Sequence, residues 1–301
     1  MNLPRKTLLI IFAFFAIYVI WGSTYLLNKI AVTQLSPLFL AAIRFITAGL
    51  LIFGIAKSMK ISLAINKKQL INCIIAGFLF LAYGNGVFVW ALKYVDSGFG
   101  ALEASTQPLM VLILMRMIDG KKIKTSSIIG IILGIIGMYL LVSQKQLVYQ
   151  ENSIIGIIMI FTCVISWSFG SLFVAKAELP SNFFINTGYQ MLSGGLLLFM
   201  ASFIIGEEWL SPLAWTGSVK FSMILLILFG SIVAFTSFNY LLKVVSTEKV
   251  STSAYVNPVI ALLLGWYVLD EKITGQSILA AVILLTGVYF INSKKNFRTL
   301  R

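Results

Sequence analysis

The sequence predicts an all-α fold: an integral membrane bundle of ten transmembrane helices formed by two inverted five-helix repeats. Three observations lead to this prediction. The chain carries few charged residues, it contains ten apolar segments of membrane-spanning length, and its second half repeats the pattern of its first half. Together they place the function of the chain inside the membrane bundle.

The amino-acid composition is that of a protein surrounded by lipid. Of 301 residues, 59% are hydrophobic and 11% are charged, and the mean hydropathy is +0.97. A soluble domain usually carries about 25% charged residues. With less than half of that amount, the surface cannot face mainly water, so we expect lipid to cover much of it.

Ten apolar runs have about the length needed to cross a hydrocarbon core, which takes roughly 20 residues in a helix. We place them at residues 7–27, 36–56, 70–92, 98–118, 126–143, 154–174, 183–205, 219–242, 250–269 and 275–292. The longest connection between them, near 206–218, is too short to fold as a separate domain. The sequence therefore predicts no soluble catalytic or nucleic-acid-binding module.

The net charge of +13 arises from basic residues that gather on one side of the predicted membrane. If the N-terminus is cytoplasmic, seventeen of the 23 Lys and Arg residues lie in cytoplasmic segments, five lie outside and Arg44 lies within a span. The positive-inside rule therefore predicts a multi-pass protein of the cell membrane with both termini in the cytoplasm. Attraction to anionic lipid is then a secondary effect, and we expect no nucleic-acid partner.

The N-terminal run and the reactive side chains exclude several alternatives. The first run begins like a signal peptide, but it lacks a small-residue cleavage site and nine more spans follow, so we expect it to be retained. Cys73 and Cys163 both fall inside predicted spans, which favours reduced thiols over a disulfide. The chain has no histidine, which excludes imidazole proton relays and histidine metal sites. We expect no metal and no cofactor.

The second half of the chain repeats the first at a nearly constant offset. A shift of 150 residues places Pro108 on Pro258 and needs no gap over about fifty residues. Further upstream, a shift of 146 places Trp21 on Trp167. Chance similarity between apolar segments would not keep a fixed register through proline, glycine and lysine, so the pattern indicates a true internal repeat.

The repeat divides the chain into a first five-helix unit at residues 1–146 and a second at 147–301. Because five is an odd number, the second unit must be inverted in the membrane relative to the first. Many secondary transporters are built from inverted repeats, which exchange conformations around a site at their interface. The alternative is a duplication that only built a stable bundle, and we favour transport.

Short motifs follow a fixed order along the whole chain. They are Trp21-Gly22-Ser23, Arg44-Phe45, Ala48-Gly49, Ser97-Gly98, Ala101-Leu102 and Pro108-Leu109, then Trp167, Gln190, Gly194-Gly195, Asn257-Pro258 and Asp270-Glu271. In this order and spacing the chain resembles an EamA-type member of the drug/metabolite transporter superfamily. The resemblance implies a ten-helix, exporter-like fold whose central cavity is lined mainly by spans 1, 3, 4, 6, 8 and 9, with spans 5 and 10 at the periphery. It also implies substrates that range over amino acids, other metabolites and drugs.

Two prolines occupy equivalent positions in the middle of predicted spans. Pro108 and Pro258 each remove one amide donor and clash with the carbonyl four residues earlier. A carbonyl freed in this way needs a partner at membrane depth, and a polar cavity supplies one. We therefore predict a pair of kinks that hinge or shape the central site, preceded by the amide side chains Gln107 and Asn257. Static kinks absorbed by packing are the alternative.

Two charged residues lie within predicted spans, Arg44 and Glu103. A charge at bilayer depth costs at least about 2.5 kcal/mol, so such residues usually pair or line a wet path. The equivalent positions in the second repeat hold Gln190 and Ser253, so both charges are absent there together. We hypothesise an Arg44–Glu103 pair that breaks during transport, with Arg44 and Gln190 as gating positions. In the alternative, Glu103 reaches the outer interface and Arg44 either extends its side chain toward the interface or caps a neighbouring helix.

The substrate-binding candidates are aromatic and polar residues away from the span ends. They are Trp21, Asn85, Glu103, Gln107, Trp167, Asn239 and Asn257. Asn85 lies between two glycines, which would let a ligand or another backbone approach closely. Because these side chains form no dominant charged cluster, we expect neutral or zwitterionic solutes.

The sequence therefore predicts a secondary transporter of small metabolites such as amino acids, with export as the expected direction. A membrane channel or sensor built on the same bundle is the alternative, since neutral residues can line a pore. An enzyme is not expected, because the spans contain a single acid and no catalytic constellation. Besides lipid and substrate, a homodimer is one possible partner, because Gly130 and Gly134 form a small-residue surface. Packing within the chain is the commoner use of such a surface.

Overall fold

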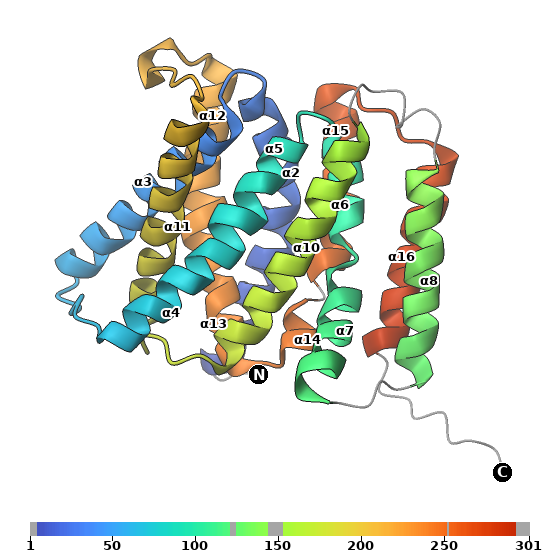
Figure 1. Ribbon diagram of the computed structural model, residues 1–301, viewed down its shortest axis with the longest axis horizontal. Helices are drawn as coiled ribbons and strands as arrows, with labels where there is room; N and C mark the ends of the chain where they lie inside the picture. Colours follow the sequence, from blue (N-terminus) through green and yellow to red (C-terminus); the bar gives the residue numbers. More distant parts are fainter. Residues whose placement is uncertain (1–4, 121–124, 144–152, 252, 293–301) are drawn as a thin grey trace.

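The structure is a computed structural model that describes residues 5–120, 125–143, 153–251 and 253–292. These residues form helices joined by loops, without a strand, as the sequence predicts (Figure 1). In the first half the elements are α1 (Arg5–Phe15), η1 (Ala16–Ile20), α2 (Trp21–Val32), α3 (Pro37–Ser58), α4 (Lys67–Gly77), η2 (Phe78–Val87), α5 (Phe88–Ala91), α6 (Ser97–Ala104), α7 (Gln107–Asp119) and α8 (Thr125–Val142).

The second half follows a similar order, but its first helix is continuous and a short helix, η3, precedes α12. It contains α10 (Ser153–Lys176), α11 (Phe183–Ile205), η3 (Pro212–Ala214), α12 (Gly217–Leu225), η4 (Leu226–Phe235), α13 (Thr236–Val244), α14 (Thr247–Val250), α15 (Ser253–Leu269) and α16 (Gly275–Asn292). The predicted boundary between the repeats, at residue 146, lies outside the described residues.

Seven helical segments of the described chain are long and apolar enough to cross a membrane: Lys6–Val32, Pro37–Ser58, Lys67–Ala91, Ser97–Ile118, Ser153–Lys176, Phe183–Ile205 and Gly217–Val244. Three shorter apolar helices, Ile128–Gly137, Val256–Leu269 and Gly275–Gly287, fall on the three remaining predicted spans. All ten predicted segments are therefore helical, and seven of them reach spanning length as described.

Helices at equivalent places in the two halves pack against each other in opposite directions. The start of α3 meets the end of α11, where Ser36 Oγ donates to Glu208 O at 3.0 Å. The start of α16 meets the end of α8, where Gln276 Nε2 donates to Leu140 O at 2.7 Å. Figure 1 shows α8 and α16 side by side at one edge of the bundle. Opposite directions of equivalent helices are what an inverted second copy would give.

Glycines set the closest contacts between helices. A Cβ at Gly77 on α4 would lie 2.5 Å from Gln190 O and 3.0 Å from Gly194 N on α11, so these two backbones touch. Between α8 and α16, a Cβ at Gly287 would lie 2.8 Å from Gly130 O and 3.3 Å from Gly134 N. The small-residue surface of α8 is therefore used within the chain, and a homodimer would need another face.

Three described segments wind as π-helices, in which each amide bonds to the carbonyl five residues earlier. Two of them, η2 and η4, are separated by 148 residues along their whole length and thus occupy the same place in the two repeats. The wider winding disturbs the regular hydrogen-bond ladder and frees backbone carbonyls for side chains. Nothing in the hydropathy pattern predicts these segments.

Candidate functional site

A cavity of about 110 Å³ lies where the two halves meet. Its aromatic walls are Trp21, Tyr25, Phe45, Phe88, Trp167 and Phe235. Its polar lining is Thr24, Asn28, Arg44, Asn85, Gln107, Ser253 and Asn257. These residues come from α2, α3, η2, α5, α7, α10, η4 and α15. The cavity therefore involves spans 1, 3, 4, 6, 8 and 9, as the resemblance implies, and span 2 in addition.

Two equivalent tryptophans, both lining this cavity, contact each other. The rings of Trp21 and Trp167 lie 5.7 Å apart in an edge-to-face arrangement. Trp21 Nε1 donates to Gly230 O at 3.1 Å, which is a carbonyl of the π-helix η4. Trp167 packs on Phe80 of the other π-helix, η2, with ring centroids 5.0 Å apart. The first helix of each repeat thus docks on the π-helix of the other repeat.

Arg44 is buried in the cavity wall, with 3% of its surface exposed. Its Nε donates to Ser231 Oγ at 2.9 Å and its Nη1 donates to Asn28 Oδ1 at 3.4 Å. Its guanidinium also lies 4.8 Å from the centre of the Phe45 ring. All of these partners are neutral.

The predicted Arg44–Glu103 ion pair is not formed, and that hypothesis is wrong for this conformation. Arg44 turns toward α2 and η4, whereas Glu103 lies on α6. Glu103 is completely buried but does not line the cavity. Neither of its carboxyl oxygens has a hydrogen-bond partner within the described part of the chain.

Replacing Glu103 by methionine should stabilise the protein by about 1–3 kcal/mol, because an apolar side chain of similar size removes two buried acceptors that lack donors. The midpoint of thermal unfolding in detergent measures this change. Glu103→Gln is the control, because its amide keeps polar atoms at the same place and should not increase the stability. A loss of stability in Glu103→Met would show that the carboxyl has a partner that stabilises the fold.

The two prolines interrupt their spans in different ways. Pro108 is the second residue of α7, which begins after a turn that follows α6, whereas Pro258 lies inside the continuous helix α15. Neither ring lines the cavity. Ala254, four residues before Pro258, does line it, so the carbonyl that Pro258 deprives of an amide belongs to a residue at the cavity. Pro108 lies in the first turn of α7, where an amide would have no partner within the helix, so it frees no helical carbonyl.

The amides next to the prolines, Gln107 and Asn257, both line the cavity. With its amide nitrogen turned toward the nearest acceptors, Asn257 donates to Tyr18 O at 2.8 Å and to Ile17 O at 3.1 Å. These carbonyls belong to the π-helix η1, so Asn257 joins the second half of the chain to the first span.

Asn239 and Gln190 do not line the cavity, which corrects the predicted binding position of Asn239. Both are completely buried between α11 and α13, where Asn239 Nδ2 donates to Gln190 Oε1 at 3.2 Å. Gln190 Nε2 in turn donates to Asn186 Oδ1 at 2.8 Å. They bond to one another in the packing of two helices, although Asn239 Oδ1 has no hydrogen-bond partner within the described part of the chain.

Sequence reasoning missed Asn28 and Ser231, the two partners of Arg44. The hydropathy of the first span predicts its end at residue 27, but α2 continues to Val32 and carries Asn28 into the bundle. The polar character of Asn28 was the available signal, because an asparagine one turn inside a helix end needs a partner. Ser231 gave no such signal, because serine is common in membrane helices.

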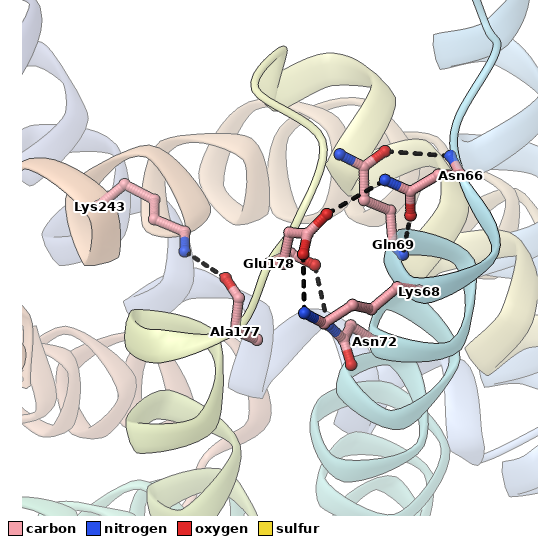
Figure 2. Close-up of polar contacts among 7 residues, drawn as sticks. All are labelled: Asn66, Lys68, Gln69, Asn72, Ala177, Glu178 and Lys243. Carbon is pink, nitrogen blue, oxygen red and sulfur yellow. Dashed lines mark hydrogen bonds and ion pairs between the residues drawn. The ribbon is translucent and has the colours of Figure 1, made fainter.

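Carboxylates from the second half hold the ends of first-half helices. At one end of the bundle, Glu178 follows α10 and meets the start of α4 (Figure 2). Its carboxylate bonds to Lys68 Nζ at 2.9 Å and accepts a bond from Asn66 Nδ2 at 3.1 Å. The hydrogen bonds from Lys68 and Asn66 lower the pKa of the exposed Glu178 carboxyl below its ordinary value. Beside it, Lys243 Nζ donates to Ala177 O at 2.9 Å.

At the opposite end, Glu271 follows α15 and caps α6. Its carboxylate accepts bonds from Ser97 N at 3.0 Å, from Ser97 Oγ at 2.8 Å and from Gly98 N at 3.2 Å. Gly265 makes room for this carboxylate, because a Cβ at that position would collide with it. Glu207 similarly accepts bonds from Leu38 N and Phe39 N at the start of α3, at 3.1 and 2.8 Å. Negative charge at a helix N-terminus is stabilising.

The family model of EamA-like transporters matches this chain twice, over residues 8–143 and 154–293. The chain belongs to the EamA-like transporter family. It is 34% identical over 300 residues to "Uncharacterized inner membrane transporter YedA" of Escherichia coli K12, covering 96% of this chain and 95% of that relative. It is also 23% identical over 274 residues to "Uncharacterized transporter YoaV" of Bacillus subtilis, covering 91% and 93%.

Two further likenesses are more distant. "Probable amino-acid metabolite efflux pump" of Escherichia coli K12 is 24% identical over 288 residues and covers 91% of each chain. A solved crystal structure of another protein is 17% identical, with a TM-score of 0.71 over 96% of this chain and 97% of its own, and shows the fold alone. This EamA-like protein is therefore a membrane transporter, as the resemblance in sequence implies.

Proposed function

We propose that this EamA-like protein is a secondary transporter that exports small metabolites, such as amino acids or related solutes, by alternating access. The observation that carries the proposal is the central cavity, whose lining comes from equivalent helices of both halves. A site between two inverted units can open to either side when the units rock against each other. The relative described as an amino-acid metabolite efflux pump supports the substrate range.

The proposal includes the number and orientation of the membrane spans. We infer ten spans in two inverted units, residues 1–146 and 147–301, with the shorter helices α8, α15 and α16 crossing the membrane together with the seven longer ones. The antiparallel packing of equivalent helices supports the inversion. From the basic residues we place the protein in the inner membrane with both termini in the cytoplasm. Glu178 then lies at the cytoplasmic end and Glu271 at the outer end.

Flux through reconstituted vesicles tests the proposal. Vesicles with the purified protein are loaded with one unlabelled amino acid at a time, and the entry of the same labelled solute is followed. A carrier should show counterflow that saturates with concentration and that competing solutes inhibit. Fast flux that does not saturate would overturn the carrier mechanism and indicate a channel. Vesicles with the Trp167→Ala variant, which lacks one wall of the cavity, are the matched control and should lose the flux.

A further inference from the structure

The central cavity contains a buried cation without a counter-charge. Arg44 donates to Ser231 Oγ and Asn28 Oδ1, and both acceptors are neutral. The ion pair in the described part of the chain joins Lys68 to Glu178 at one end of the bundle. No acidic residue is among the described residues that line the cavity. The positive charge of Arg44 is therefore not neutralised by the described protein groups.

Such a charge favours an anion in the cavity. A guanidinium has five N–H donors, and the two bonds to Ser231 and Asn28 use two of them. A buried charge without a partner is costly at membrane depth, so a group that neutralises it binds with a corresponding gain. The flat guanidinium matches the two oxygens of a carboxylate, which accept two parallel bonds from it.

A second polar group in the same cavity lacks a partner. Asn85 lines the cavity, and its Oδ1 is buried without a hydrogen-bond donor within the described part of the chain. Leaving such an acceptor unsatisfied is unfavourable, and an N–H or O–H of a ligand would satisfy it. The cavity thus offers a cationic group for a carboxylate and a neutral acceptor for a hydrogen-bond donor.

The remaining walls are apolar and aromatic. Trp21, Trp167 and Phe235 face the cavity and offer surface for the hydrophobic body of a ligand. Without a lining carboxylate, nothing in the described cavity neutralises a ligand with a net positive charge.

We propose that the cavity binds small organic carboxylates, with the carboxylate group on Arg44 and an amino or hydroxyl donor on Asn85 Oδ1. This inference rests on the proposed function, because it names the substrate class of the same cavity. It also refines the expectation of neutral or zwitterionic solutes, since the carboxylate end of a zwitterion meets a specific partner.

Binding of matched probes tests the proposal. The probes are L-leucine, 2-hydroxy-4-methylpentanoate and the primary amide of each, measured by calorimetry on the purified protein. Each acid should bind about ten- to a hundredfold more tightly than its amide, as expected for a charge-assisted hydrogen bond. 4-Methylpentanoate, which lacks the donor group, should bind about tenfold more weakly than the hydroxy acid.

Arg44→Gln should remove the difference between acid and amide. The fold accepts a buried glutamine at the equivalent position of the second half, Gln190, so this substitution suits the repeat. Arg116→Gln is the matched control, because Arg116 is exposed at the end of α7, and it should keep the preference for the acid. If Arg44→Gln does not fold, the comparison of acid with amide in the wild-type protein still decides.

The proposal is overturned if the amides bind as tightly as the acids, or if folded Arg44→Gln keeps the preference. Its failure can be told apart from failure of the carrier function. Saturable flux of solutes that lack a carboxylate, unchanged in Arg44→Gln, would refute the carboxylate site and leave the carrier intact. Tight binding of the acids together with unsaturable flux would keep the site and refute the carrier.

Discussion

Gly77→Ala is expected to destabilise the protein by about 3 kcal/mol, because the added methyl overlaps backbone that cannot move independently. On α11 it would lie 2.5 Å from Gln190 O and 3.0 Å from Gly194 N, and it would collide with Ser193 Oγ. Gln190 is also held by Asn239 and Asn186, so a shift of α11 would disturb a buried hydrogen-bond network. The measurement is the midpoint of thermal unfolding in detergent.

Gly54→Ala provides the matched control. A Cβ at Gly54 on α3 would meet no atom within 4 Å, so the same chemical change adds no overlap there. Because alanine favours a helix over glycine by about 0.5–1 kcal/mol, this variant should be as stable as the wild type or slightly more stable. Equal effects of the two substitutions would contradict the close approach of α4 and α11.

Glu271→Gln is expected to loosen the N-terminal end of α6. The carboxylate accepts bonds from two backbone amides and from one hydroxyl at the start of that helix. Charge-assisted bonds of this kind are worth about 1.5–3 kcal/mol each, and the loss of charge also removes the interaction with the helix dipole. Hydrogen exchange of the Ser97 and Gly98 amides should therefore accelerate about tenfold or more.

Glu208→Gln is the control for this experiment. Glu208 is exposed at the same end of the bundle, and the described contacts of this residue involve its backbone carbonyl. The exchange of the Ser97 and Gly98 amides should be the same in this variant as in the wild type. If Glu208→Gln accelerates the exchange of these amides as much as Glu271→Gln does, the effect comes from net charge and not from the cap by Glu271.

The helices and the equivalence between the two halves could be predicted because they depend on patterns that the sequence carries directly. Apolar runs of membrane-spanning length produce helices, since every backbone polar group must be satisfied within the segment. The fixed register of Pro108 with Pro258 identifies equivalent helices. The inferred odd number of spans in each unit predicts that equivalent helices run in opposite directions, but not that they pack against each other. Trp21 and Trp167 were expected at the cavity because they lie in the middle of their spans, and both line it.

The partners of the polar residues could not be predicted in the same way. Hydropathy identifies Arg44 and Glu103 as unusual, but the direction of each side chain depends on helix rotation. The partners also depend on local winding, because Ser231, which accepts a hydrogen bond from Arg44, lies on the π-helix η4. A switch from α-helical to π-helical hydrogen bonding leaves the sequence of apolar residues unchanged, so the hydropathy pattern does not reveal it. Asn239 shows the same limit: its place in the middle of a span predicts a cavity residue, but its side chain turns toward Gln190 on α11.

The accessibility of one cavity residue from both sides of the membrane tests alternating access most directly. Ala254→Cys introduces a thiol at the cavity, and Cys163→Ala in the same chain removes the native thiol that also lines it. In sealed vesicles of known orientation, a membrane-impermeant thiol reagent is added to one face at a time. Glu271→Gln is then introduced to weaken the outer end. If access alternates, labelling of Cys at position 254 becomes faster from the outer face and slower from the cytoplasmic face. Labelling rates that rise together from both faces would contradict the account and indicate a continuous pore.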